Sequence, residues 1–320
     1  MSCLPKTLTY LANKGANIKI TGGVDNLDAL HTAIVTYPHV GTLQRAKAVV
    51  TLVKLGLDIE KFSVEQKTAL MAACSVGARE VVKELILLGA NVNAINDSNQ
   101  NAVHHAVIGQ DSYDFSFRFE TNKNKIIIDL AKAGANINLC EYAGATPLIY
   151  AIKLNCKEIF DTLLNLNVDI NTFDYTDTLP LYYALLIKDL YFINMLYKTK
   201  KLDVNKANKF NYTVLHQLLV LDFHNKIFEE ILETLINMDF DINYHDDIEP
   251  ALLMYVKTMN FVSQRSVGFV KSEKKPKENE DKIAKLFVKY KADVQLCIDI
   301  ANKQNESDDI INYLQTLKDL

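Results

Sequence analysis

The sequence predicts an all-α solenoid built from stacked helix pairs. One short phrase recurs along the chain: an amphipathic run, a small residue pair, Asp or Asn, and then Ile or Val. Copies at Gly56 and Gly89, and at Gly134 and Asn167, start 33 positions apart, and insertions lengthen the other intervals. Twelve residues after most copies, a second phrase opens another helical pattern. A period of this length indicates a helix pair that needs a neighbouring pair to bury its apolar face.

The first phrase marks the end of the second helix of each repeat. Ahead of Gly89, the apolar residues Val81, Val82, Leu85, Ile86 and Leu88 fall at helical spacing, so one face must be buried. A glycine after the last turn can take the left-handed conformation without a Cβ penalty, which ends the helix. The copies begin at Gly15, Gly56, Gly89, Gly134, Asn167, Lys201, Asp239 and Lys291. The last three suit this position less well, so those repeats are expected to be less regular.

The second phrase marks the start of the first helix of each repeat. Its copies read TALMAA from Thr68, NAVHHA from Asn101, TPLIYA from Thr146, LPLYYA from Leu179 and TVLHQL from Thr213, with DALHTA from Asp28 one residue later. Threonine at this position can cap exposed amides, and a following proline is tolerated in the first turn. Small residues at Ala33, Ala73, Ala106, Ala151 and Ala184 should let adjacent helix pairs approach closely.

Together the two phrases resemble the ankyrin repeat, which runs TPLHxA, a turn, a second helix ending LLxxGAxVN, and a projecting hairpin. The resemblance covers nearly the whole chain and is specific through repetition. It implies an ankyrin-repeat solenoid of about eight repeats including caps, with short projecting hairpins. We expect one domain over residues 1–320, a half-repeat cap at 1–20 and a second cap at 292–320. The register around Pro250 can be aligned in two ways.

Three insertions are expected between the first and second helices of a repeat, at residues 38–44, 108–124 and 262–281. The second carries Tyr113, Phe115, Phe117 and Phe119 in strict alternation, which is typical of a strand with one apolar face. This strip either pairs with the strand edge of a partner or covers the flank of its own repeats. The third insertion has mixed charges and should be a mobile loop.

Composition and charge exclude several classes of function. Lys and Arg number 35 against 39 for Asp and Glu, a formal charge of −4, which gives no cationic field for nucleic acid or anionic lipid. No apolar run approaches the roughly 20 residues that a membrane helix needs. Five scattered cysteines fit a reducing compartment, and neither Cys nor His shows metal-ligand spacing. We expect a monomeric cytoplasmic protein without metal, cofactor, nucleic acid or membrane.

Candidates for catalysis are few. The resemblance implies that His31, His104 and His216, in the His position of TPLHxA, form hydrogen bonds between hairpins. His105 and Cys156 remain as candidates for a hydrolase-like site improvised on the array, although no oriented partner is spaced to activate them. A further alternative is a regulatory subunit of a separate enzyme. We expect no catalytic residue and no enzyme activity.

The resemblance also implies a binding face, because ankyrin partners are usually gripped by hairpin tips and the exposed part of the first helix. Carried over to this chain, the positions are Tyr142, Tyr175, Phe210 and Tyr212 at the tips, with Leu186 and Ile187 on a helix. Aromatic anchors dominate many interfaces, but each ring could instead pack on the neighbouring hairpin. The sequence therefore predicts a scaffold or adaptor that binds a protein.

The use of Asn, Lys and Ile is heavy, and the array stands alone in the chain. In this it resembles effectors that intracellular bacteria deliver into host cells, and also viral or protist arrays. A host-directed effector would act in the host cytoplasm.

Overall fold

The computed structural model describes residues 4–21, 27–35, 41–63, 66–109, 122–187, 189–221, 227–244, 248–257 and 278–320. These residues form helices joined by turns, and no β-strand occurs among them. The chain divides into two compact units, Met1–Thr176 and Asp177–Leu320, which are described separately below. No helix in the described ranges has the length and apolarity needed to cross a bilayer.

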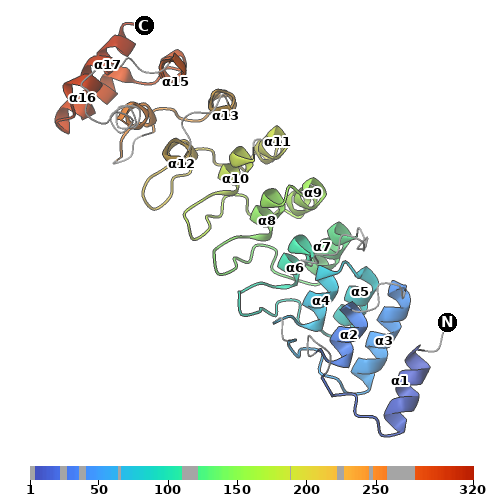
Figure 1. Ribbon diagram of the computed structural model, residues 1–320. Helices are drawn as coiled ribbons and strands as arrows, with labels where there is room; N and C mark the ends of the chain where they lie inside the picture. Colours follow the sequence, from blue (N-terminus) through green and yellow to red (C-terminus); the bar gives the residue numbers. More distant parts are fainter. Residues whose placement is uncertain are drawn as a thin grey trace. The chain divides into compact units, whose positions relative to one another are not determined.

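The first unit stacks two rows of helices (Figure 1). Its helices are α1 (Leu4–Asn13), α2 (Ala29–Val35), α3 (Thr42–Lys54), α4 (Ala69–Ser75), α5 (Arg79–Leu87), α6 (Ala102–Ile108), α7 (Lys123–Lys132), α8 (Pro147–Lys153) and α9 (Lys157–Asn165). Helices α2, α4, α6 and α8 pack in sequence to form one row, and α1, α3, α5, α7 and α9 form the other. Helix α1 packs on α3 in the second row, and the half-repeat cap expected at residues 1–20 stays a prediction.

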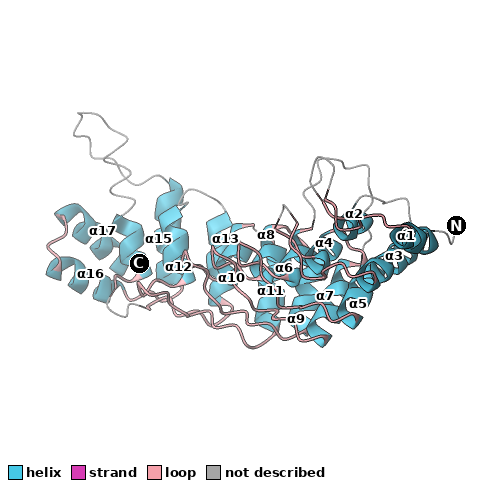
Figure 2. Ribbon diagram, turned by 90° about the horizontal axis from the view of Figure 1, so that it is seen from below, coloured by secondary structure: helices cyan, strands magenta, loops and turns pink. Residues whose placement is uncertain are grey.

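The second unit repeats the arrangement with α10 (Pro180–Leu186), α11 (Leu190–Lys198), α12 (Val214–Leu221), α13 (Ile227–Ile236), a helical stretch at residues 251–257, α15 (Glu278–Lys289), α16 (Val294–Lys303) and α17 (Asp308–Lys318). Helix α10 packs on α11 and α12, and α17 packs on α15 and α16 (Figure 2). Ile310, Leu314 and Leu317 of α17 are buried and Ile311 is half-buried, and the cap expected at 292–320 stays a prediction.

The core lies between the two rows. Leu70 of the first row and Leu85, Ile126 and Phe160 of the second row have almost no exposed surface in the first unit. In the second unit, the ring of Tyr255 stacks between Phe228 and Phe287 with centroid distances of 6.4 and 5.8 Å. The small first-row residues Ala73, Ala106, Ala151 and Ala184 are fully buried. The helical spacing of apolar residues is therefore confirmed as the origin of the core.

The first-row helices begin as their sequences predict. The side chains of Thr68 and Thr146 accept hydrogen bonds from the backbone N–H groups of Met71 and Ile149, both at 3.3 Å. Pro147 and Pro180 are the first residues of their helices. Such caps satisfy amides that have no partner within the helix.

The left-handed residue that ends the second helix is confirmed at most predicted positions. The glycines have φ values of 87° to 91°, and Asn167, Asp239 and Lys291 reach 66°, 61° and 65°. The prediction that Lys201 takes the left-handed conformation is wrong, because Lys200 takes it instead, with φ 55°. The Thr199 hydroxyl donates to the Leu196 carbonyl at 2.7 Å and accepts from the Lys201 amide at 3.2 Å, so this turn ends one residue earlier.

All three expected insertions extend too far at their C-terminal ends. Helix α3 begins at Thr42, α7 at Lys123 and α15 at Glu278, so residues 42–44, 123–124 and 278–281 are helical. The aromatic strip at residues 113–119 lies outside the described ranges. The single domain over 1–320 stays a prediction.

Candidate functional site

Several repeats in the described ranges present a five-residue turn, here called a tip, at residues 96–100, 141–145 and 208–212, with a related turn starting at Asp174. The amide of Ser63 donates to the carbonyl of Lys67 at 2.9 Å, as the first residue of a tip does to the last. In the tip at 96–100, the backbone amide of Asn96 donates to the carbonyl of Gln100 at 3.0 Å. The Asn96 side-chain oxygen accepts from the amides of Ser98 and Gln100 at 3.0 and 2.8 Å. Ser63, Glu141, Asp174 and Asn208 occupy the same first position. A polar side chain therefore fixes the backbone of each tip from within.

Successive tips of the first unit are joined through their backbones. The amide of Tyr142 donates to the carbonyl of Ser98 at 3.0 Å, and the amide of Tyr175 donates to the carbonyl of Ala143 at 3.1 Å. Gly144 has φ 81°, and a Cβ built there would lie 2.2 Å from the Tyr175 nitrogen. The close approach of two tips therefore requires glycine at this position.

A second set of contacts crosses between repeats below the tips. The side-chain oxygen of Asn93 accepts from the amide of Asn136 at 2.7 Å, and its nitrogen donates to the carbonyl of Gly134 at 3.0 Å. Asn138 accepts from the Asp169 amide at 2.9 Å. In the second unit, Asn205 and Asn243 make the equivalent pair of bonds to the following repeat. The sequence analysis missed these residues, although an Asn recurs two positions after the Asp or Asn of the first phrase.

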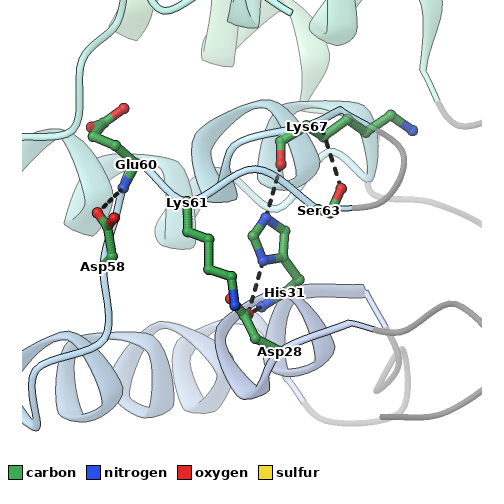
Figure 3. A network of polar contacts seen from close by, with 7 residues as sticks. All are labelled: Asp28, His31, Asp58, Glu60, Lys61, Ser63 and Lys67. Carbon is green, nitrogen blue, oxygen red and sulfur yellow. Dashed lines mark hydrogen bonds and ion pairs between the residues drawn. The ribbon is translucent and has the colours of Figure 1, made fainter. Parts of the chain in front are cut away.

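The three histidines of the TPLHxA position make the bridging contact that the resemblance implies. Figure 3 shows His31, whose Nδ1 lies 2.9 Å from Asp28 Oδ1 and whose Nε2 lies 2.9 Å from the carbonyl oxygen of Lys67. His104 Nε2 lies 3.4 Å from the carbonyl of Ala145. His216 Nε2 lies 3.1 Å from the carbonyl of Glu249. Each ring thus reaches a backbone carbonyl of the next repeat.

The His216 contact also settles the register around Pro250. Lys67 and Ala145 directly precede the capping residues Thr68 and Thr146, and Glu249 directly precedes Pro250. Pro250 therefore occupies the capping position, and the helical stretch 251–257 follows it.

The polar network around His31 is structural in character (Figure 3). Burial acts to raise the pKa of Asp28, but hydrogen bonds from the His31 side chain and backbone, with the charges of His31 and Lys61, lower it to about 2. Lys61 Nζ lies 3.7 Å from Asp28 Oδ2. Asp28 and His31 are both buried, so the network has no exposed group at its centre that could act on a substrate.

The candidates for catalysis lack the required electrostatics. Burial, together with the positive charges of Lys67 and His104, lowers the pKa of His105 to about 4. Burial raises the pKa of Cys156, against an opposing effect of Lys123. An activated thiol needs a lowered pKa, and a general base is most effective near the operating pH. Within the described residues, no group of three His, Cys, Asp or Glu side chains could hold a metal ion.

The residues predicted to bind a partner differ in exposure. Tyr142, Tyr175 and Phe210 project from their tips with 67%, 65% and 59% of their surface exposed. Tyr212 is half-buried and its ring stacks on His216 at a centroid distance of 5.9 Å. Tyr212 therefore packs on α12 of its own repeat, whereas the rings of Tyr142, Tyr175 and Phe210 are mostly exposed. The choice between binding a partner and packing on the neighbouring hairpin stays open.

The remaining predicted contacts lie elsewhere. Leu186, 42% exposed, is the last residue of α10, and Ile187 is half-buried directly after it. Tyr113, Phe115, Phe117 and Phe119 lie outside the described residues, so their two alternatives stay open. A binding role for all of these positions stays a prediction.

Comparison with known proteins finds ankyrin repeats in two parts of the chain. A family model of ankyrin repeats in three copies matches residues 42–115, and a model of the single ankyrin repeat matches residues 143–175. A curated ankyrin repeat protein of Acanthamoeba polyphaga mimivirus is 26% identical over 258 residues, which cover 79% of this chain and 29% of that protein. The chain therefore spans less than a third of the length of this relative.

Solved structures show the same fold. The ankyrin repeat domain of Bcl-3, described as a unique member of the IκB protein family, has a TM-score of 0.53 at 22% identity, covering 66% of this chain and 86% of that domain. The human ASB11 ankyrin repeat domain has a TM-score of 0.53 at 17% identity, covering 74% of this chain and 95% of that domain. The predicted all-α solenoid is thereby confirmed.

Proposed function

Because this chain is an ankyrin-repeat protein, we propose that it binds another protein through the exposed tips of its repeats. Ankyrin repeats are in general modules for protein–protein interaction, and solenoids present extended surfaces to their partners. The proposal includes Tyr142, Tyr175, Phe210 and the half-buried Tyr212 at the tips, and Leu186 and Ile187 at the end of α10. The chain would act as a scaffold or adaptor, as a monomer without chemistry of its own.

The observation that carries the proposal is the exposure of three aromatic rings on fixed backbones. The rings of Tyr142, Tyr175 and Phe210 are mostly exposed, whereas hydrogen bonds hold the main chain of each. Aromatic side chains on rigid supports lose little conformational entropy on binding and bury a large area. They are therefore suited to anchor a partner.

A narrower version places the partner in a host cell. The relative encoded by a virus of an amoeba favours a host-directed effector that works in the host cytoplasm. The same test addresses both versions, because the proteins captured by the chain identify the cell in which it acts.

The test replaces Tyr142, Tyr175 and Phe210 together with Ala. Since the three rings are mostly exposed, the thermal midpoint should change by no more than a few degrees. Partner affinity should fall by about 100-fold or more, because anchor residues contribute about 2 kcal/mol or more each. Affinity capture from native cytosol followed by mass spectrometry identifies the partner, and calorimetry measures the affinity.

The matched control is Tyr10→Ala on α1, which removes a ring of similar exposure, 61%, away from the tips. Binding by this variant should equal that of the unmodified chain. A large loss of stability in the triple variant would mean that the rings belong to the core, and unchanged binding would refute the proposal.

A further inference from the structure

We infer that the tips at residues 96–100 and 141–145 and at Asp174–Thr176 bind an extended basic segment of the partner, with Arg or Lys side chains on the rings of Tyr142 and Tyr175. This inference rests on the proposed function and specifies the chemistry of the ligand at the same site. It concerns only the first unit of the chain.

Charge is the first argument. The three tips contain Asp97, Glu141 and Asp174 and no Lys, Arg or His. Asp97 is exposed, whereas Glu141 and Asp174 are buried and accept hydrogen bonds from the amides of Ala145 and Thr176 in their own tips. A surface with one sign of charge attracts a segment of the opposite sign and repels anions such as nucleic acid phosphates.

The negative charge of these tips shifts the pKa values of neighbouring groups. Burial raises the pKa of Cys140, and the charges of Glu141, Asp169 and Asp174 raise it further. Burial also raises the pKa of Tyr150, and Glu141 adds to that shift. The carboxylates of two neighbouring tips, Glu141 and Asp174, therefore act together on Cys140, as a field that a basic ligand would experience on approach.

The faces of the two tyrosine rings are the second argument. Elsewhere in the chain, exposed rings are covered by a lysine of their own segment: Lys14 lies 5.7 Å from the ring centroid of Tyr10, and Lys209 lies 5.1 Å from that of Phe210. No cation among the described residues covers the ring of Tyr142 or Tyr175. Both rings can therefore accept a cation from another molecule.

Geometry is the third argument. Tyr142 and Tyr175 occupy the second position of neighbouring tips, and the amide of each donates to the carbonyl at the third position of the tip before it. Their backbones are thus equivalent, one repeat apart. Packed helices lie about 8–10 Å apart. An extended peptide in the polyproline II conformation has three residues per turn and advances about 3.1 Å per residue, so every third side chain faces the same way. Cationic side chains at every third position of an extended peptide would therefore match successive rings.

The experiment uses the full chain and two fluorescent peptides, one with Arg and one with Glu at every third position, separated by Gly and Ser. The Arg peptide should bind, with an affinity that falls as salt rises because Asp97 is exposed to solvent. The Glu peptide should not bind. Equal binding of both peptides, or no binding of the Arg peptide, would overturn the inference.

Variants locate the site. Tyr142→Ala combined with Tyr175→Ala should weaken Arg-peptide binding by about tenfold. The charge reversal Asp97→Lys should also weaken it. Tyr142→Phe with Tyr175→Phe keeps both ring faces and should retain binding, and Tyr10→Ala is the matched control. Circular dichroism and thermal midpoints show whether each variant is folded. A double Ala variant that is folded and binds normally would place the peptide elsewhere and refute the inference.

Competition separates this inference from the proposed function. The Arg peptide should displace the captured native partner from the unmodified chain. If the partner requires the tip aromatics but is not displaced, the basic ligand is wrong and the proposed function stands. If the partner is retained by the triple Ala variant of the tips, the proposed function itself fails.

Discussion

At the scale of single residues, two glycines show that one backbone conformation serves different purposes. Gly89 and Gly144 have similar φ values, 87° and 81°. A Cβ at Gly89 would meet no atom within 4 Å, whereas one at Gly144 would lie 2.2 Å from the Tyr175 nitrogen and 2.8 Å from the Asp174 Cα. Gly89 therefore serves only to end a helix, and Gly144 also permits two tips to touch.

This difference predicts unequal costs for the same substitution. Gly89→Ala should lower the free energy of unfolding by about 1–2 kcal/mol, the usual cost of a left-handed non-glycine residue. Gly144→Ala should cost clearly more, because the methyl group forces the backbone of the next tip to move. Urea denaturation of the two variants measures the comparison, and equal losses would show that the tips separate without strain.

At the scale of the repeat, the helices and the histidine bridges could be predicted, and the asparagine bridges between repeats were missed. Apolar spacing and the capping residue, as at Thr146, depend on residues close in sequence, so they can be read from the chain. The two bridges made by Asn93 reach residues 41 and 43 positions away. Their partners are backbone groups, which carry no sequence signal. Lys200, which ends α11, was missed because a one-residue change in turn length leaves the motif intact.

The candidate site was predictable in position but not in exposure. The repeat places Tyr142, Tyr175, Phe210 and Tyr212 at tips, which the sequence shows directly. Sequence does not show that Tyr212 stacks on His216 while Tyr142 remains exposed, because both follow from side-chain packing.

The Asn bridges lead to a prediction at this scale. Asn93→Ala removes one accepted and one donated hydrogen bond between repeats, and should lower the free energy of unfolding by about 1–2 kcal/mol. Asn93→Asp keeps the acceptor for the Asn136 amide and loses only the donor, so its loss should be smaller. Chemical denaturation distinguishes the two. If both variants have the same free energy of unfolding as the unmodified chain, the bridges form as a result of repeat stacking and do not stabilise it.

At the scale of the whole molecule, buried histidines predict sensitivity to acid. Burial lowers the pKa of His104, His105 and His216 to about 4, from a usual value of 6.5. These histidines bind protons more readily in the unfolded chain than in the folded one. They therefore do not reduce the free energy of unfolding above pH 6.5, and they reduce it progressively as pH falls towards 4. At pH 5 each histidine should cost about 2 kcal/mol. The pKa of Asp28, about 2, affects stability only at lower pH.

Denaturation at pH 7 and pH 5 tests this expectation. The unmodified chain should be markedly less stable at pH 5, and His105→Gln and His216→Gln should each reduce the difference by about 2 kcal/mol. Comparing two variants from different compact units also checks that the effect is spread along the chain. A pH dependence that neither substitution alters would assign it to other groups.

The turn geometry of the tips has a consequence for how such a protein diversifies. At Tyr142 and Tyr175 the main-chain amide supports the neighbouring repeat while the side chain faces solvent. Every residue type except proline supplies that amide. Side chains at these positions can therefore be substituted one at a time without changing the fold. Relatives with the same architecture can in this way bind unrelated partners.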